Sequence, residues 1–199
     1  MSYEMIAIGA SWGGLHAVSS VLDGLSSEVG ATVVIAQHRG IDSSRGMLES
    51  LLQRHTDRPV SSPDDKEPIE LRRVYVAPAD YHLLVEDGHF ALSTDTRVQH
   101  ARPSIDVLFE SVAEIYRERA VGIVLTGANA DGAEGLAAIN SQGGVAIVQD
   151  PESAERRAMP DAAIAGTVAD AVLPLEEIPG FLHGLCCGPV RSTAREAGR

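Results

Sequence analysis

The stretch Met5-Ile6-Ala7-Ile8-Gly9-Ala10-Ser11-Trp12-Gly13-Gly14 decides the fold of this chain, because an apolar run stops there at a serine that glycines follow. Residues 5–10 have the length and composition of a buried strand, and from Leu15 the apolar residues recur at helical spacing. Ser11 is therefore expected in a tight turn from a strand to a helix. The glycines allow dihedral angles that a Cβ would oppose, and they leave N–H groups at the helix start open to a ligand. Such a turn suits either a phosphate group or a nucleophile beside an oxyanion site.

Two further apolar runs end at side chains that carry chemistry. Residues 32–37 are followed by His38, and residues 121–126 lead into a loop that contains Asp131. The carboxyl ends of parallel strands share one edge of a sheet, and ligand crevices form at that edge. We therefore expect Ser11, His38 and Asp131 together, and they are the residue types of a nucleophile, a base and a carboxylate that orients the base.

Each of these three residues also has a plainer interpretation. Ser11 alone could be a helix cap, and His38 could be a hydrogen-bonded histidine at a strand end. Asp131 could cap the helix that begins near Gly132, and the sequence does not separate that role from holding His38. The glycines around Ser11 and the shared sheet edge favour the catalytic interpretation.

Strands alternate with helices along the chain, which predicts a doubly wound α/β fold with a mainly parallel sheet sandwiched by helices. An antiparallel hairpin around Asp87-Gly88 is expected as an addition to that sheet. The predicted strands are 5–10, 32–37, 73–77, 121–126 and 144–149, and the predicted helices begin at 15 or span 45–55, 105–119, 135–142 and 175–185. Residues 59–68 are expected to form a loop.

Composition favours one catalytic domain over residues 1–187, followed by a flexible tail over 188–199, because 44% of the 199 residues are apolar. The sequence shows neither an apolar run of about 18 residues nor the layout of a signal peptide, so we expect a cytoplasmic protein that is not inserted into a membrane. The net charge of −12 argues against a nucleic-acid partner. The adjacent Cys186 and Cys187 are expected to be reduced thiols on a terminal helix, and no metal or organic cofactor is expected.

Nine short segments resemble the catalytic domain of the chemotaxis receptor methylesterases, the CheB family. They run in family order as Ile8–Gly14, Gln37-His38, Tyr75–Pro78, Tyr81–Leu83, Arg102–Phe109, Leu125–Gly127, Asp131–Ala133, Gln149–Pro151 and Met159-Pro160. The resemblance implies that Ser11 is the nucleophile, that His38 is the general base and that Asp131 is its partner. It also implies a serine hydrolase that removes methyl groups from glutamate γ-methyl esters on chemoreceptor helices, and it allows deamidation of glutamine side chains.

The surroundings of the expected nucleophile depart from the family pattern. Trp12 stands where the family commonly has Thr or Ala, and Ala128 stands where Met is usual, so the pocket has been reshaped. The backbone N–H groups of Trp12, Gly13 and Ala128 are still expected to form the oxyanion site, because a backbone donor survives a change of side chain. The family's receiver domain does not precede Ser11 in this chain, so we expect an uncovered site that is active without phosphorylation.

Methylated receptor helices are acidic, so a local basic rim would have to dock them on this acidic protein. Arg39, Arg45, Arg97 and Arg102 are the candidates, and solvated surface arginines are the plainer interpretation. Of these, Arg39 and Arg102 are the predicted substrate contacts, together with Met159. The sequence does not indicate an oligomeric state.

Two other functions stay open. A regulatory module without catalytic activity could bind a nucleotide or a receptor helix through the glycine-rich turn, although the turn lacks the Lys-Ser/Thr ending of a P-loop. His38 also stands where a dinucleotide-binding fold requires an acidic residue. A related esterase with another substrate is the second alternative, because Trp12 and Ala128 alter the pocket.

Overall fold

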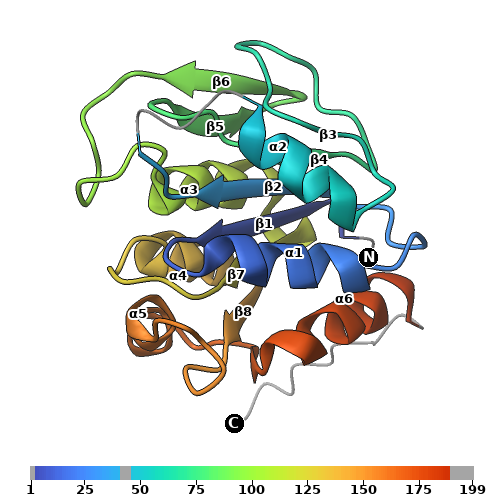
Figure 1. Ribbon diagram of the computed structural model, residues 1–199, viewed down its shortest axis with the longest axis vertical. Coiled ribbons are helices and arrows are strands. Elements are labelled where there is room, and N and C mark those ends of the chain that lie inside the picture. Colours follow the sequence, from blue (N-terminus) through green and yellow to red (C-terminus); the bar gives the residue numbers. More distant parts are fainter. Residues whose placement is uncertain (1–2, 41–45, 189–199) are drawn as a thin grey trace, which may run out of the picture.

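The computed structural model describes residues 3–40 and 46–188 and contains a central sheet of seven parallel strands (Figure 1). The spatial order is β3-β4-β2-β1-β7-β8-β9. These strands are β1 (Met5–Ala10), β2 (Thr32–Gln37), β3 (Val60–Ser61), β4 (Val74–Val76), β7 (Ala120–Val124), β8 (Val145–Gln149) and β9 (Ala171–Leu173). The strand order reverses between β1 and β7, which is the position where open α/β sheets form their ligand crevice.

Helices cover both faces of the sheet, as the doubly wound prediction requires (Figure 1). One face carries α1 (Gly14–Gly24), α2 (Met47–Leu52) and α6 (Ile178–Cys187). The other face carries α3 (Ile105–Tyr116), α4 (Ala133–Ser141) and α5 (Ala158–Gly166). Short 3-10 helices span Gln53–His55, Arg117–Arg119 and Leu175–Glu177.

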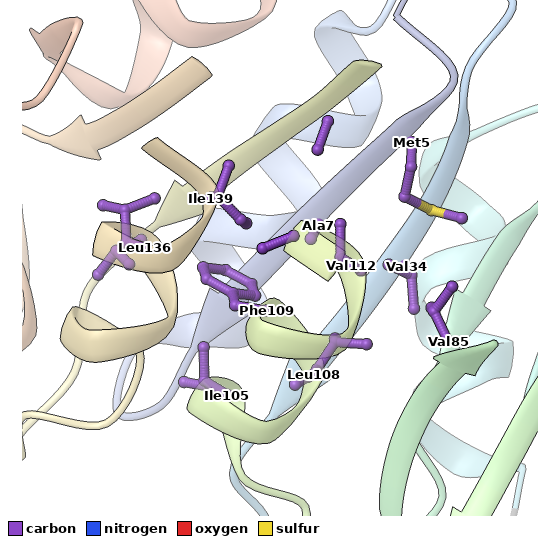
Figure 2. Close-up of a cluster of buried hydrophobic side chains, with 14 of the residues drawn as sticks. Met5, Ala7, Val34, Val85, Ile105, Leu108, Phe109, Val112, Leu136 and Ile139 are labelled. Carbon is purple, nitrogen blue, oxygen red and sulfur yellow. The ribbon is translucent and has the colours of Figure 1, made fainter. Parts of the chain in front are cut away.

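The core lies in two layers because successive side chains of a strand point to opposite faces of the sheet. In β1, Met5 and Ala7 pack toward α3 and α4, whereas Ile6 packs toward α1. Figure 2 shows the first layer, in which Phe109 of α3 lies among Ala7 and side chains of α4. Burying a side chain of this size contributes about 1.5–3 kcal/mol, so this layer fixes the position of the start of α3.

The predicted hairpin is confirmed, and it forms a two-stranded sheet of its own from β5 (His82–Glu86) and β6 (His89–Ser93). It packs on α3, where the N–H of Val85 donates to Ser111 Oγ at 3.0 Å. The hairpin thus extends the helix layer of α3 and is not an eighth strand of the main sheet.

Several predicted boundaries were wrong by a few residues, each for a local reason. The helix predicted over 105–119 ends at Tyr116, because Arg117 takes a φ of 50° that breaks the helix. The helix predicted from residue 135 begins at Ala133, directly after Gly132 with a φ of 101°. β3 lies inside the predicted loop 59–68, and α5 and β9 were not predicted.

Three remaining expectations concern the ends of elements and the membrane. The start of the helix predicted over 45–55 and the tail residues 189–199 lie outside the described residues. Cys186 and Cys187 are free thiols at the end of α6, as predicted. In the described parts of the chain, no helix has both the length and the apolar composition to cross a membrane.

Candidate active site

The turn that carries Ser11 is formed as the sequence predicted. Ser11 directly follows β1, and Gly13, with a φ of 76°, is the last residue before α1. The N–H of Ser11 donates to the Thr126 carbonyl at 3.0 Å, and the Ser11 carbonyl accepts from the N–H of Gly14 at 2.9 Å. These bonds fix the backbone on both sides of the serine, so its side chain is presented at the carboxyl edge of the sheet.

The loop after β7 passes directly against Ser11. A Cβ at Gly127 would lie 2.9 Å from Ser11 Cβ and would collide with the side chain of Met159. Gly127 also forms backbone hydrogen bonds around the start of α5, since its N–H donates to the Arg156 carbonyl at 3.0 Å and its carbonyl accepts from the N–H of Met159 at 3.1 Å. Only glycine permits this close approach, which brings the Asp131 loop next to the serine.

His38 lies beside Ser11 because of the register between β1 and β2. Ala10 pairs with Gln37, and the N–H of His38 donates to the Ala10 carbonyl at 3.0 Å. Ser11 and His38 therefore follow neighbouring positions of the adjacent strands β1 and β2. The ring of His38 contacts the buried carboxylate of Asp131, with 2.6 Å between Nε2 and Oδ2. The structure therefore brings the three predicted residues to one sheet edge.

Asn129 defines which nitrogen of His38 is available as a base. The N–H of Asp131 donates to Asn129 Oδ1 at 3.3 Å, which turns the amide nitrogen of Asn129 toward His38 Nδ1 at 3.4 Å. The Asp131 carboxylate at Nε2 accepts the ring proton there and leaves the lone pair on Nδ1, where the Asn129 amide donates until the Ser11 hydroxyl replaces it. The Ser11 hydroxyl makes no side-chain hydrogen bond with the described residues, and such catalytic bonds often form only with substrate.

Asp131 caps α3 and not α4, the helix that its plainer interpretation named. Its carboxylate accepts hydrogen bonds from Ser104 Oγ at 2.9 Å and from the N–H groups of Ile105 and Asp106 at 2.8 and 2.9 Å, at the start of α3. Burial alone would raise the pKa of Asp131, but the hydrogen bonds from His38 and from these backbone groups lower it below its ordinary value. Asp131 therefore stays ionised and accepts the ring proton of His38.

Asp106, in the first turn of α3, caps the start of α4. Its carboxylate accepts from the N–H groups of Gly132 and Gly135, both at 2.8 Å, so each of two neighbouring helices is capped by the carboxylate of the other segment. Burial raises the pKa of Asp106 to about 6, and the nearby charge of Asp131 adds to this shift. Neither Asp106 nor Asn129 was predicted as a site residue from the sequence. The signals of Asp106 were its place in the first turn of a predicted helix and in the family-like segment Arg102–Phe109.

We expect Asp106→Asn to become more stable relative to the wild type as pH rises from 4 to 7. The unfolded carboxyl ionises near its ordinary pKa of 3.8 whereas the folded one holds its proton to about 6, so the wild type loses stability in this window. Asparagine does not titrate and still offers an oxygen to Gly132 and Gly135. The expected relative gain is at most about 3 kcal/mol, measured by urea unfolding at several pH values. A difference that stays flat or reverses with pH would contradict this account.

The expected oxyanion donors are unoccupied by the chain itself. Within residues 3–40 and 46–188, the backbone N–H groups of Trp12, Gly13 and Ala128 donate to no protein acceptor. The carbonyl of Trp12 accepts from Thr126 Oγ1 at 3.0 Å, which holds the turn in this orientation. N–H groups that flank a nucleophile and lack partners among the described residues are available to a developing oxyanion.

The side chain of Trp12 lies at the rim of the site and is 58% exposed. Its indole N–H donates to Glu155 at 2.8 Å, and the guanidinium of Arg156 lies 5.4 Å from its ring centroid. The sequence analysis missed Glu155 and Arg156, which belong to the loop before α5. This loop holds the indole in place beside Ser11.

The predicted substrate contacts are placed differently from one another. Arg39, Arg97 and Arg102 line one cavity with His38, whereas Met159 is 1% exposed and packs behind Gly127. Arg45 lies outside the described residues.

A group of side chains with metal-ligating atoms lies elsewhere on the surface. Glu28, His183 and Cys187 place one such atom each within 4.8 Å of one another, and all three are exposed. Glu28 precedes β2, at the opposite edge of the sheet from Ser11. The trio is therefore separate from the candidate active site.

The site combines a serine between a strand and a helix, a histidine held by a buried carboxylate, and unpaired N–H groups at the switch point. This combination is typical of α/β enzymes that hydrolyse esters through a serine. A family model described as CheB methylesterase matches residues 6–182. The chain belongs to the CheB methylesterase family.

Individual relatives agree with this assignment. A relative in Leptospira interrogans is 46% identical over 179 residues, which cover 89% of this chain and 92% of the relative. Protein-glutamate methylesterase/protein-glutamine glutaminase 1 of Hahella chejuensis is 41% identical, and the match covers 88% of this chain but 49% of that protein. The crystal structure of the Thermotoga maritima CheB methylesterase catalytic domain matches 92% of this chain and 98% of its own, with a TM-score of 0.85 and 30% identity.

Proposed function

We propose that this chain hydrolyses glutamate γ-methyl esters on chemoreceptor-type proteins through Ser11, His38 and Asp131. The observation that carries the proposal is the 2.6 Å contact between His38 Nε2 and the buried Asp131 carboxylate. His38 directly follows β2, and Ser11 directly follows the neighbouring strand β1. Family membership supports the same reaction class.

The mechanism follows from the roles of these groups. His38 Nδ1 takes the hydroxyl proton of Ser11 as the Ser11 oxygen attacks the ester carbonyl. The N–H groups of Trp12, Gly13 and Ala128 hold the resulting oxyanion. The carbon–oxygen bond to methanol then breaks, and methanol leaves with the proton that His38 returns. Water repeats these steps on the acyl-enzyme, which frees the carboxylate and restores Ser11. The same steps would release ammonia from a glutamine side chain.

Methanol release from a methylated receptor tests this function directly. We expect release without any added metal or cofactor, together with covalent labelling of Ser11 by a fluorophosphonate probe. Labelling with hydrolysis of simple esters but not of the receptor would favour a related esterase with another substrate. Stabilisation by a nucleotide without labelling would favour the regulatory module instead.

A further inference from the structure

A basic cavity of about 490 Å³ opens directly beside the candidate base. It is lined by His38 and Asn129 together with four basic side chains, Arg39, Arg97, His100 and Arg102. Its size is that of a site for a small ligand or for one or two side chains. The cavity contrasts with the chain as a whole, which has a net charge of −12.

Among residues 3–40 and 46–188, the positive charge of this cavity is only partly compensated by carboxylates. A single carboxylate oxygen of Asp80 accepts from Arg97 at 3.2 Å and from Arg102 at 2.7 Å, so two guanidinium groups share one negative charge. Arg39 lies 3.6 Å from Glu49, and its buried Nε has no acceptor among the residues that the structure describes. An uncompensated charge and an unused donor both favour an anion from outside the chain.

The remaining basic side chain, His100, is presented by a strained turn. Val98 and Ala101 exchange two backbone hydrogen bonds of 3.2 and 2.8 Å, and the residues between them, Gln99 and His100, have φ values of 46° and 68°. Turns of this kind usually contain Asn-Gly, and each left-handed residue other than glycine costs about 1–2 kcal/mol. His100 is exposed and lines the cavity.

Gln99 ties this turn to Asp106 at the start of α3, next to Asp131. Its amide nitrogen donates to Asp106 Oδ2 at 3.0 Å, and the N–H of Asp106 donates in turn to Asp131. The turn is therefore held at a constant position relative to His38. A strained conformation that is fixed from the catalytic centre is more typical of a binding element than of an unconstrained surface loop.

We propose that this cavity is a carboxylate subsite, in which Arg97 and His100 bind an acidic side chain that flanks the glutamate ester of the substrate. The inference rests on the proposed function and adds a substrate preference to it. Arg39 and Arg102 supply the positive field from inside the cavity, whereas Arg97, with 49% of its side chain exposed, and His100 are accessible to the substrate.

Two synthetic peptides test the subsite. Each peptide carries one glutamate γ-methyl ester. The peptides differ only at the residues three and four positions from that ester, which are glutamate in one peptide and alanine in the other. We expect the wild type to show a kcat/KM about 3–10-fold higher for the acidic peptide at low salt. The gain should come from a lower KM, and the preference should disappear at high salt.

Arg97→Ala and His100→Ala should each reduce this preference about 2–5-fold, while kcat and fluorophosphonate labelling stay unchanged. Matched controls are Arg54→Ala and His183→Ala, which remove the same side-chain types from exposed positions near the opposite edge of the sheet. Neither control should alter the preference. Binding of the acidic peptide to inactive Ser11→Ala, measured by fluorescence anisotropy, should weaken in the same two variants.

The outcomes separate the subsite from the proposed function. Hydrolysis of neither peptide by the wild type would overturn the proposed function. Equal hydrolysis of both peptides, or a preference that survives Arg97→Ala and His100→Ala, would overturn the subsite and leave the esterase assignment intact.

Discussion

Ser11→Ala is expected to reduce methanol release from a methylated receptor by a factor of about 10³–10⁶, while the melting temperature changes by only a few degrees. The substitution removes the attacking oxygen and nothing else that the site uses. The backbone bonds from Ser11 to Thr126 and from Gly14 to Ser11 persist, because they do not involve the side chain. Ser11 also contributes no core volume, so the fold has little to lose.

Ser20→Ala is the matched control for this measurement. Ser20 lies nine residues after Ser11, inside α1, and its hydroxyl donates to the His16 carbonyl at 3.0 Å. We expect this variant to keep wild-type turnover and labelling. Turnover by Ser11→Ala within a few-fold of the wild type would show that another group carries the reaction.

The sequence predicted the part of the site that depends on local patterns. An apolar run followed by Ser11 and glycines indicates a strand-to-helix turn whatever surrounds it, and the structure has that turn. Parallel strands then place the residues after them at one edge, which is why His38 and Asp131 could be grouped with Ser11 before any contact was known.

The interactions between α3 and α4 could not be predicted in this way. Asp106 and Asp131 are 25 positions apart. Asp131 caps α3, the helix that contains Asp106, and Asp106 caps α4, the helix that follows Asp131, only because the two helices pack side by side on the same face. The plainer interpretation of Asp131, a cap of α4, does not hold for this reason, since α4 receives its cap from Asp106. α5 and β9 are short elements without a strong periodic pattern, so tertiary packing defines them.

Asp131→Asn is the second variant with a large expected effect, and it distinguishes the two roles of this carboxylate. Asparagine can keep its oxygen toward Ser104 and Asp106, but its amide nitrogen then faces the N–H of Ile105 and the ring of His38. An amide donor at Nε2 forces the proton of His38 onto Nδ1, the nitrogen that must accept the serine proton. We expect kcat to fall about 10³–10⁴-fold, the size of loss associated with a wrong histidine tautomer.

The cost in stability should be much smaller than the cost in activity. The buried N–H of Ile105 loses its acceptor, which predicts about 1–3 kcal/mol in urea unfolding at pH 7. Asp131→Ala removes the acceptor of all four donors and should destabilise the protein further with a similar loss of turnover. Asp170→Asn is the control, because Asp170 accepts from the N–H of Ala146 at 2.8 Å at the opposite sheet edge and should leave turnover unchanged. If Asp131→Asn retained turnover within tenfold of the wild type, capping of α3 would be the whole role of Asp131, and His38 would need no carboxylate partner to act as the base.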